Sequence, residues 1–253
     1  MLVQAAALAA PPQNPIDTLV FPPRETVIRL YTDCTEARWP WDTAEAFVPK
    51  TPEEISSGVA RRRALETGWR AWYAARADDS LPFTAPDAWA YPLGVRGRLV
   101  DNYLSPRAGG PHDALDLFVT REGVPVRSPV DGLVIAAGDD WLGGWRRHGG
   151  FHYEGGGLSR RAGNGVIVFD AGSGAYLYFA HLHRGVLVHA GDVVRRGQQL
   201  GRVGHTGNAA TPGHGHHLHL AYKLPGTACG VDGVLVSQDP YALLRAARSR
   251  RRR

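Results

Sequence analysis

The sequence predicts a mainly β protein with an N-terminal helical segment, and three observations support this fold class. Glycine and proline are frequent, with 31 and 18 residues in a chain of 253, and so many turn-forming residues favour short strands over long helices. From about residue 93 onward, short apolar or alternating runs are separated by turns that contain glycine. A single strong helical pattern precedes them. We therefore expect one helix followed by an antiparallel β domain.

The chain divides into four segments on these patterns. In order, they are an irregular or extended lead-in rich in proline (1–45), a helical segment (46–92), the β domain (93–244, with an insertion at 139–164) and an arginine-rich tail (245–253). The lead-in opens with a short alanine and leucine stretch in which Ala7-Leu8-Ala9 resembles a signal-peptidase site. This stretch is either the remnant of a signal peptide or an alanine-rich terminus, and both interpretations stay open.

The helix is expected to begin after Thr51. Thr51 is a favourable N-cap, Pro52 suits the first helical position, and Glu54 lies three residues after the cap, as in a capping box. Apolar residues then recur at roughly helical spacing up to about residue 77: Ile55, Val59, Leu65, Trp69 and Trp72. An apolar stripe of this kind predicts a helix that packs on the β domain.

The β domain contains eight candidate strands, separated by glycine-containing turns. They are Asp116–Val119, Val124–Val126, Gly132–Ala137, Gly165–Asp170, Ala175–Leu182, Val186–His189, Leu200–Val203 and His217–Tyr222. The insertion at 139–164 interrupts this series, and loops of this length in compact domains are often functional. Its aromatic side chains and one histidine either line a groove or pack among themselves: Trp141, Trp145, His152 and Tyr153.

The formal net charge of +5 is concentrated at the C-terminal end of the chain. The arginines there are Arg245, Arg248, Arg250, Arg251, Arg252 and Arg253, and without them the chain is nearly neutral. A nearly neutral body argues against specific nucleic-acid binding. The tail is expected to be either a solvated, disordered end or a contact to anionic surfaces.

Two cysteines, Cys34 and Cys229, are too few for a disulfide scaffold, and the absence of a CxxC pair argues against a structural zinc site. They either form a single bridge in an oxidising compartment or remain separate thiols, and the sequence fits both. No apolar run reaches the ~18 residues that a membrane-spanning helix needs, so no transmembrane segment is predicted.

All eleven histidines lie between His112 and His219, and their arrangement indicates a metal site. His112 and Asp116 form H-x-x-x-D at the start of one predicted strand, and His217 and His219 form H-x-H within another. Because alternate residues of a strand share a face, His217 and His219 can both face one site while the leucines beside them pack on the other side.

A third predicted strand brings in His181. Two imidazoles and one carboxylate are a standard ligand set for catalytic zinc, which keeps a position open for water. Imidazole must bind a metal unprotonated, so an activity that depends on such a site should fall in acid. His181 and His183 form a second H-x-H, and a different histidine pair is therefore the alternative.

Three motifs stand in order along the β domain: H-D-A-L-D at 112–116, Y-F-A-H-L at 178–182 and H-L-H at 217–219. They resemble the signatures of the M23 peptidases, the lysostaphin and LytM-type zinc endopeptidases. The glycine-containing segments at 123–132 and 191–207 resemble the sequences that connect the three motifs in that family. Asp239-Pro240, followed by Leu243-Leu244, resembles its usual ending. The resemblance covers about residues 95 to 245, and the order and spacing of the motifs make the combination specific.

The resemblance implies an antiparallel β-sheet groove domain of the lysostaphin/LytM type, with one Zn²⁺ ion on its floor. His112, Asp116 and His219 would be the zinc ligands, and His181 and His217 the catalytic pair, either of which could be the general base. The implied function is hydrolysis of the peptide cross-links of bacterial peptidoglycan by metal-activated water. Such an enzyme would meet its peptidoglycan peptide substrate outside the cytoplasm, in the periplasm or as a secreted protein.

Two positions depart from the family pattern. Ala114 replaces the usual glycine of H-x-G-x-D, which keeps a small residue there. Phe179 stands where the family usually has a tyrosine, two residues before the catalytic histidine, and tyrosines lie at 176 and 178 instead. If that hydroxyl assists elsewhere in the family, this protein lacks it or supplies it differently.

Two alternative functions accompany the main hypothesis. Some proteins of this fold are non-enzymatic LytM-type regulators of cell-wall amidases. Those regulators typically lack zinc ligands, whereas all matching ligands are present here. The other alternative is a zinc protease that acts on glycine-rich proteins.

Overall fold

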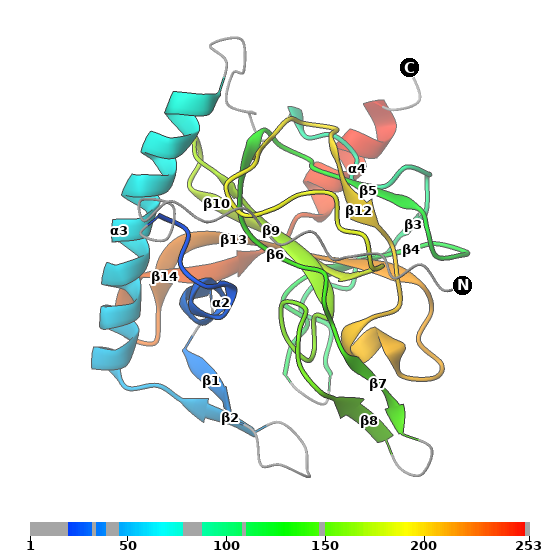
Figure 1. Ribbon diagram of the computed structural model, residues 1–253, viewed down its shortest axis with the longest axis horizontal. Coiled ribbons are helices and arrows are strands. Elements are labelled where there is room, and N and C mark those ends of the chain that lie inside the picture. The colour runs from blue at the N-terminus through cyan, green and yellow to red at the C-terminus, as the bar shows by residue number, and fades with distance from the viewer. Residues whose placement is uncertain are drawn as a thin grey trace, which may run out of the picture.

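The computed structural model describes residues 20–31, 34–38, 46–77, 88–107, 110–146 and 150–250, and Figure 1 shows their arrangement. The helices are α2 (Arg24–Tyr31), α3 (Pro52–Arg76), the 3-10 helix η2 (Gly207–Ala210) and α4 (Tyr241–Arg250). The strands are β1 (Thr35–Arg38), β2 (Ala46–Pro49), β3 (Arg98–Leu99), β4 (Leu115–Phe118), β5 (Pro125–Arg127), β6 (Gly132–Gly138), β7 (Gly143–Arg146), β8 (Gly150–Tyr153), β9 (Asn164–Asp170), β10 (Ala175–Leu182), β11 (Val193–Val194), β12 (Gln199–Arg202), β13 (His217–Ala228) and β14 (Val231–Gln238).

An eight-stranded sheet forms the centre of the structure, in the order β11-β6-β9-β10-β13-β4-β3, with β14 paired to β13 outside this path. Its neighbouring strands pair antiparallel. The first residues of β13 pair with β4 and its later residues with β14, while β10 pairs along its other edge. The predicted fold class, mainly antiparallel β with N-terminal helices, is confirmed.

The two faces of the sheet carry two separate hydrophobic clusters, because successive side chains of a strand point to opposite faces. One cluster contains the leucines of β4 and β13, among them Leu117 and Leu218, which are fully buried. The opposite face is covered in part by α2 and α3, whose Val27 and Trp69 join the second cluster. The polar residues of β4 and β13 therefore lie on the face that the N-terminal helices partly cover.

Helix α3 begins and ends close to where the sequence predicts. The Thr51 hydroxyl accepts from the backbone N–H of Glu54 at 3.2 Å, and the Glu54 carboxylate accepts from the backbone N–H of Thr51 at 2.8 Å. These two bonds complete a capping box. The apolar stripe packs as expected, since Ile55, Val59 and Trp69 are buried.

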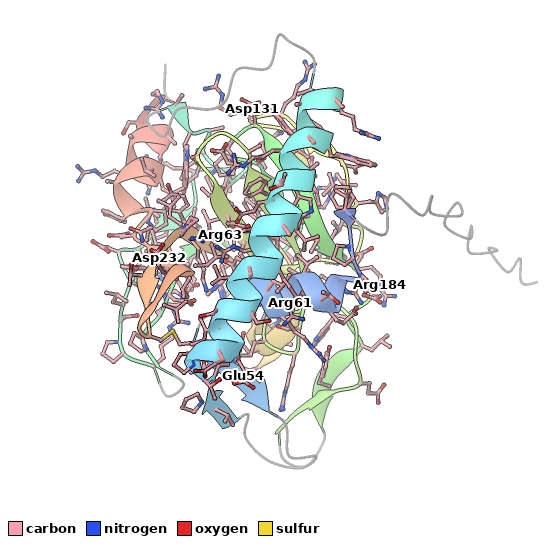
Figure 2. All side chains as sticks on the ribbon, turned by 90° about the vertical axis from the view of Figure 1, so that its left-hand side faces the viewer. Glu54, Arg61, Arg63, Asp131, Arg184 and Asp232 are labelled. Atoms are coloured by element: carbon pink, nitrogen blue, oxygen red, sulfur yellow. A yellow bond between two sulfur atoms is a disulfide. The ribbon has the colours of Figure 1, made fainter. Side chains whose placement is uncertain are left out.

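Polar contacts along α3 hold it against the rest of the chain. The indole N–H of Trp69 donates to the carbonyl of Val20 at 2.7 Å, and that of Trp72 donates to the carbonyl of Gly191 at 2.9 Å. Figure 2 shows Arg63 of α3 facing Asp232 of β14, and the ion pair between them measures 3.5 Å. The helix thus spans from the N-terminal segment to the last strand of the sheet.

Two α-helices in the described part of the chain lie where the sequence patterns predict none. Helix α2 lies within the segment predicted to be an irregular or extended lead-in. Helix α4 extends to Arg250, through residues predicted to form a solvated tail. It is ordered there because Ala247 is buried and the guanidinium of Arg250 donates to the carbonyl of Trp89 at 3.1 Å. None of the helices that the structure describes has the length and apolar character of a bilayer-crossing segment.

Seven of the eight predicted strands coincide with observed strands to within a few residues. The prediction for 186–189 is wrong, because this segment has no strand and instead forms single backbone bonds such as Leu187 N–H to the carbonyl of Leu200. The sequence shows no alternating pattern at strands β11 and β14 that predicts them. The insertion at 139–164 contains the hairpin β7–β8. The suggested signal remnant at the N-terminus lies outside the described residues.

Cys34 and Cys229 form a disulfide across a sequence separation of 195 residues, which answers the question that the sequence leaves open. The bridge connects the chain just after α2 to the turn between β13 and β14. Nearby, the ring of Tyr31 at the end of α2 stacks on Tyr178 of β10, with centroids 5.0 Å apart. The bridge and this stacking together hold α2 against the sheet.

Replacing both cysteines, as Cys34→Ser with Cys229→Ser, is expected to lower the free energy of unfolding by about 2–5 kcal/mol, because the bridge restricts the unfolded chain over a long loop. Urea unfolding of the variant beside the oxidised wild type measures the difference. A reducing agent should lower the wild-type midpoint and leave that of the variant unchanged. Identical midpoints for the variant and the oxidised wild type would contradict a stabilising role.

Candidate metal centre

The antiparallel pairing of β4 with β13 brings the predicted ligands together. Asp116 of β4 lies directly opposite His219 of β13. Cross-strand partners share a face of the sheet, with Cβ atoms about 4.5–5.5 Å apart, so the two side chains converge while the leucines beside them point into the core. His112 reaches the same point from the loop before β4, and the three residues form a group that could hold a metal ion.

The three donor atoms form a nearly regular triangle. Nε2 of His112 lies 3.3 Å from Nδ1 of His219 and 3.4 Å from Oδ1 of Asp116, and Nδ1 of His219 lies 3.3 Å from that same oxygen. Zinc bonds of about 2.0–2.1 Å at tetrahedral angles separate neighbouring ligand atoms by about 3.3–3.4 Å. The donor set and its spacing therefore fit a zinc ion, and three protein ligands leave a fourth position for water.

Groups outside the triangle orient the ligands. The side-chain amide of Asn102 donates to Oδ2 of Asp116 at 3.1 Å, and the backbone carbonyl of Asn102 accepts from Nδ1 of His112 at 3.0 Å. Arg107 donates to the same Oδ2 at 2.5 Å. Because Oδ2 is held by these donors, Oδ1 is the oxygen turned toward the histidines. Contacts of this kind fix the orientation of metal ligands and raise metal affinity.

His181 and His217 lie beside the triangle. Their ring centroids are 4.9 Å apart, and the His181 ring lies 5.6 Å from that of His219. Nε2 of His217 is 3.8 Å from Oδ1 of Asp116. All five histidine and aspartate residues singled out by the motifs thus lie in one cluster.

In each of these two histidines, a backbone carbonyl contacts one ring nitrogen and leaves the other nitrogen free. Nδ1 of His181 lies 2.9 Å from the carbonyl oxygen of Thr206, and Nδ1 of His217 lies 2.7 Å from that of Gly215. A neutral ring that donates from Nδ1 carries its lone pair on Nε2. Both side chains are therefore arranged to accept a proton at Nε2.

The electrostatics of the cluster favour neutral His181 and His217 and an ionised Asp116. Burial lowers the pKa of His181 well below its ordinary value, and the neighbouring His219 and His217 lower it further. Burial also lowers the pKa of His217, against an opposing effect of Asp116. Burial would raise the pKa of Asp116, but hydrogen bonds from His112 and His219 outweigh it and hold that pKa well below its usual range.

A backbone irregularity turns His181 toward this cluster. Its φ angle is 62°, in the left-handed region that residues other than glycine rarely adopt. The pairing of β10 with β9 shifts register between Phe179 and Leu182. Strict alternation would send His181 to the same side as Phe179, which is buried in the core, whereas the irregularity lets it line the groove. Strain of this kind is often found at functional sites.

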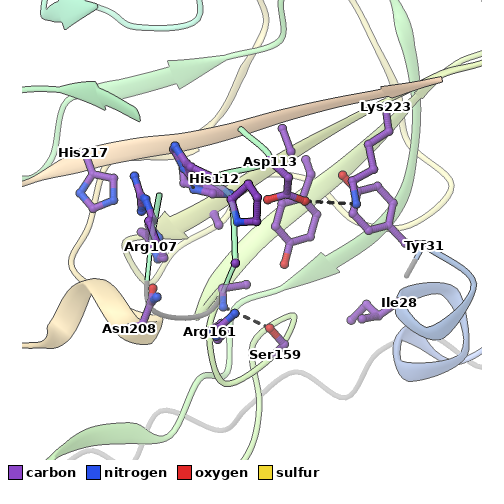
Figure 3. Close-up of a pocket in the computed structure, with 18 of the residues that line it drawn as sticks. Ile28, Tyr31, Arg107, His112, Asp113, Ser159, Arg161, Asn208, His217 and Lys223 are labelled. Atoms are coloured by element: carbon purple, nitrogen blue, oxygen red, sulfur yellow. Dashed lines mark hydrogen bonds and ion pairs between the residues drawn. The ribbon is translucent and has the colours of Figure 1, made fainter. Parts of the chain in front are cut away.

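The cluster lies in a groove of about 380 Å³, part of which Figure 3 shows. Asp113 and Lys223 lie farther along it, with Nζ of Lys223 3.4 Å from Oδ2 of Asp113. Nζ of Lys223 also lies 4.6 Å from the ring centroid of Tyr31. Tyr31 and Ile28 belong to α2, so the N-terminal segment forms part of the groove wall.

The structure shows where the other candidate tyrosine, histidine and tryptophan residues lie relative to the groove. Tyr178 lines the groove, so a tyrosine hydroxyl lies on this face although Phe179 occupies the family's usual position. His183 is exposed, with Nδ1 2.8 Å from the carbonyl of Arg184, and lies outside the described ligand group. Among the described residues of the insertion, Trp141 and Tyr153 do not line the groove. The side chains of Trp145 and His152 lie outside the described part of the structure.

Sequence reasoning missed the groups that support the ligands. Asn102 and Arg107 stand in the loop before His112, outside any motif, and only their contacts with Asp116 reveal them. The pair of Asp113 and Lys223 was also missed. Asp113 lies within the H-D-A-L-D motif, and Lys223 is one of few lysines in the chain, so these two offered at least a weak signal.

Two imidazoles and one carboxylate on an antiparallel sheet, with two further histidines beside them, are a donor set of the kind that metallohydrolases use. Residues 110–229 match the family model described as peptidase family M23. The predicted resemblance to that family is thereby confirmed.

Solved structures of similar fold include three with lysostaphin or lytM in their descriptions. The antimicrobial peptidase lysostaphin from Staphylococcus simulans is 21% identical with a TM-score of 0.44, and the match covers 64% of this chain and 55% of that one. A Ruminococcus gnavus protein assigned as a lytM glycyl-glycine endopeptidase is 23% identical, with a TM-score of 0.49 and coverage of 94% and 88%. The separate catalytic domain of lysostaphin is 24% identical, with a TM-score of 0.40 and coverage of 59% and 92%. The chain thus spans about half the length of the first of these structures.

Replacing Asn102 by alanine is expected to weaken zinc binding about 10–100-fold, because the carboxylate of Asp116 loses a donor that orients it. Competition with a chelator of known affinity measures the change. Asn208→Ala, which alters another residue of the groove, serves as the matched control and should leave the affinity unchanged. Equal affinities in Asn102→Ala and the wild type would show that this contact does not support the site.

Proposed function

We propose that this protein is a zinc-dependent endopeptidase that hydrolyses the peptide cross-links of bacterial peptidoglycan. The observation that carries the proposal is the triangle of donor atoms from His112, Asp116 and His219, with edges of 3.3–3.4 Å. We assign these residues as the zinc ligands and His181 and His217 as the catalytic pair. The match to a peptidase family supports the reaction class.

The chain's own residues supply proton transfer beside the metal. When bound, a zinc ion supplies Lewis acidity, which makes water more acidic and polarises a carbonyl group. His181 and His217 offer neutral imidazoles with Nε2 free to take a proton from the attacking water and return it to the leaving amine. Their Nδ1 contacts with Thr206 and Gly215 keep both rings oriented during that exchange.

The groove and the disulfide support the proposed substrate and compartment. A groove, unlike a closed cavity, accepts a peptide that is part of a larger polymer. The bridge between Cys34 and Cys229 supports an oxidising compartment, such as the periplasm or the cell exterior, where peptidoglycan lies. Exposed arginines of α4, including Arg245, are available for contact with anionic wall polymers.

Incubation of purified sacculi with the zinc-loaded protein should release soluble muropeptides, which mass spectrometry identifies together with the bond that is cut. His219→Ala should lose the zinc ion of the groove site and release nothing, because only two of three ligands remain. His189→Ala is the matched control, since His189 is exposed and outside the cluster. Full activity of His219→Ala would refute the ligand assignment.

The same assay separates the alternative functions. A glycine-rich protein digested beside the sacculi reports a protease directed at proteins, and its cleavage with intact sacculi would overturn the peptidoglycan assignment. A non-enzymatic regulator would hold no zinc at the groove site and release no muropeptides from any sample.

Replacing His181 or His217 by alanine should reduce kcat about 10²–10⁴-fold while zinc remains bound, because each variant removes a proton-transfer group and retains the ligands. Zinc content and kcat, measured on the same preparations, test this separation. Loss of zinc in proportion to activity would instead identify the altered histidine as a ligand. Wild-type kcat in both variants would exclude them from catalysis.

A further inference from the structure

A second group of metal-binding side chains lies outside the groove. Glu122, His205 and His216 offer ligand atoms that all lie within 4.8 Å of one another. They come from three separate segments: the turn after β4, the loop between β12 and η2, and the residue just before β13. None of the three lines the groove, so this cluster is distinct from the site assigned above.

His216 carries an unusual nitrogen within this cluster. Its Nδ1 atom is buried and has no hydrogen-bond partner in the described part of the chain. Buried polar atoms without a partner are uncommon and costly. The nearest carboxylate oxygen, Oε1 of Glu122, is 3.6 Å away, too far for a good hydrogen bond. That distance is close to the roughly 3.3–3.4 Å between neighbouring ligands of a tetrahedral zinc ion.

A backbone carbonyl holds the ring of His205 in place. Its Nε2 atom lies 3.2 Å from the carbonyl oxygen of His214, and a carbonyl partner of this kind commonly fixes the tautomer and direction of a metal-binding histidine. The rings of His205 and His216 have centroids 5.2 Å apart, at an interplanar angle of 67°. The two rings therefore lie edge to face, and Glu122 adds negative charge beside them.

We propose that Glu122, His205 and His216 bind a second divalent transition-metal ion, of the Zn²⁺ or Ni²⁺ type. Two imidazoles and one carboxylate suit these borderline metals better than Mg²⁺ or Ca²⁺, which prefer all-oxygen sites. The assignment is independent of the peptidase activity proposed above, because it uses none of the same residues.

An ion at this position joins segments that support the groove site. His205 precedes Thr206, whose carbonyl accepts from His181, and His216 precedes His217. Binding thus ties the loop after β12 to the start of β13 and to the turn after β4. Its role is to brace the backbone behind the two catalytic histidines, and it requires no reaction at the second ion.

Titration of the full-length metal-free protein with Zn²⁺ alone, followed by calorimetry, tests the proposal. The wild type should bind two equivalents, the second more weakly, and His219→Ala should keep the second event while it loses the first. His205→Gln and His216→Gln should each weaken the second event at least about tenfold, since losing a ligand costs no less than losing an orienting contact. The first event reports that these variants are folded.

The matched control is His189→Gln, which changes an exposed histidine outside both clusters and should still bind two equivalents. A wild type that binds a single equivalent would overturn the proposal. So would a second event that survives unchanged in both His205→Gln and His216→Gln, or one that His189→Gln weakens equally, since the ion would then lie elsewhere on the surface.

Discussion

The antiparallel pairing of β4 with β13 is the constraint on which the candidate site depends. It sets Asp116 opposite His219 and leaves His217 two residues away on the same face. A register slip of one residue would send these side chains into the leucine-rich core and the leucines into the groove. Leu117 and Leu218, both fully buried, oppose that slip, because the same alternation that buries them turns the candidate metal ligands toward the groove. The same strand register thus determines both the core packing and the geometry of the candidate site.

The N-terminal segment completes the groove that this register begins. Helices α2 and α3 cover the part of the sheet away from the histidines, with Trp69 in the shared core. Tyr31 lies between Lys223 and Tyr178, and the disulfide of Cys34 anchors the chain three residues later. The segment before residues 110–229 therefore forms part of the groove wall.

Local patterns in the sequence predicted much of this architecture. Capping chemistry predicted the start of α3 to the residue, and strands with continuous apolar runs, such as β6 and β9, were recognised. Alternation also predicted that His217 and His219 share a face. No local pattern in the sequence reports which distant strands pair. The convergence of His112, Asp116 and His219 was therefore expected only from the ligand chemistry and from the resemblance to a peptidase family.

The features that were missed depend on tertiary contacts. Helix α2 is short and lies among prolines, so packing against the sheet stabilises it more than its own propensity does. Helix α4 looked like a charged tail because its burial rests on only a few residues, such as Leu244 and Ala247. Asn102 acts through one amide in a loop. The cluster of Glu122, His205 and His216 joins three segments whose proximity only the folded chain reveals.

The most direct test of the account is anomalous diffraction at the zinc edge from crystals of the zinc-loaded protein. A peak is expected in the groove within bonding distance, about 2.0–2.2 Å, of Nε2 of His112, Oδ1 of Asp116 and Nδ1 of His219. His181 and His217 should lie next to that peak without bonding to it. A groove with no peak at full zinc occupancy, or a peak bound by His181 or His217 in place of these ligands, would contradict the account.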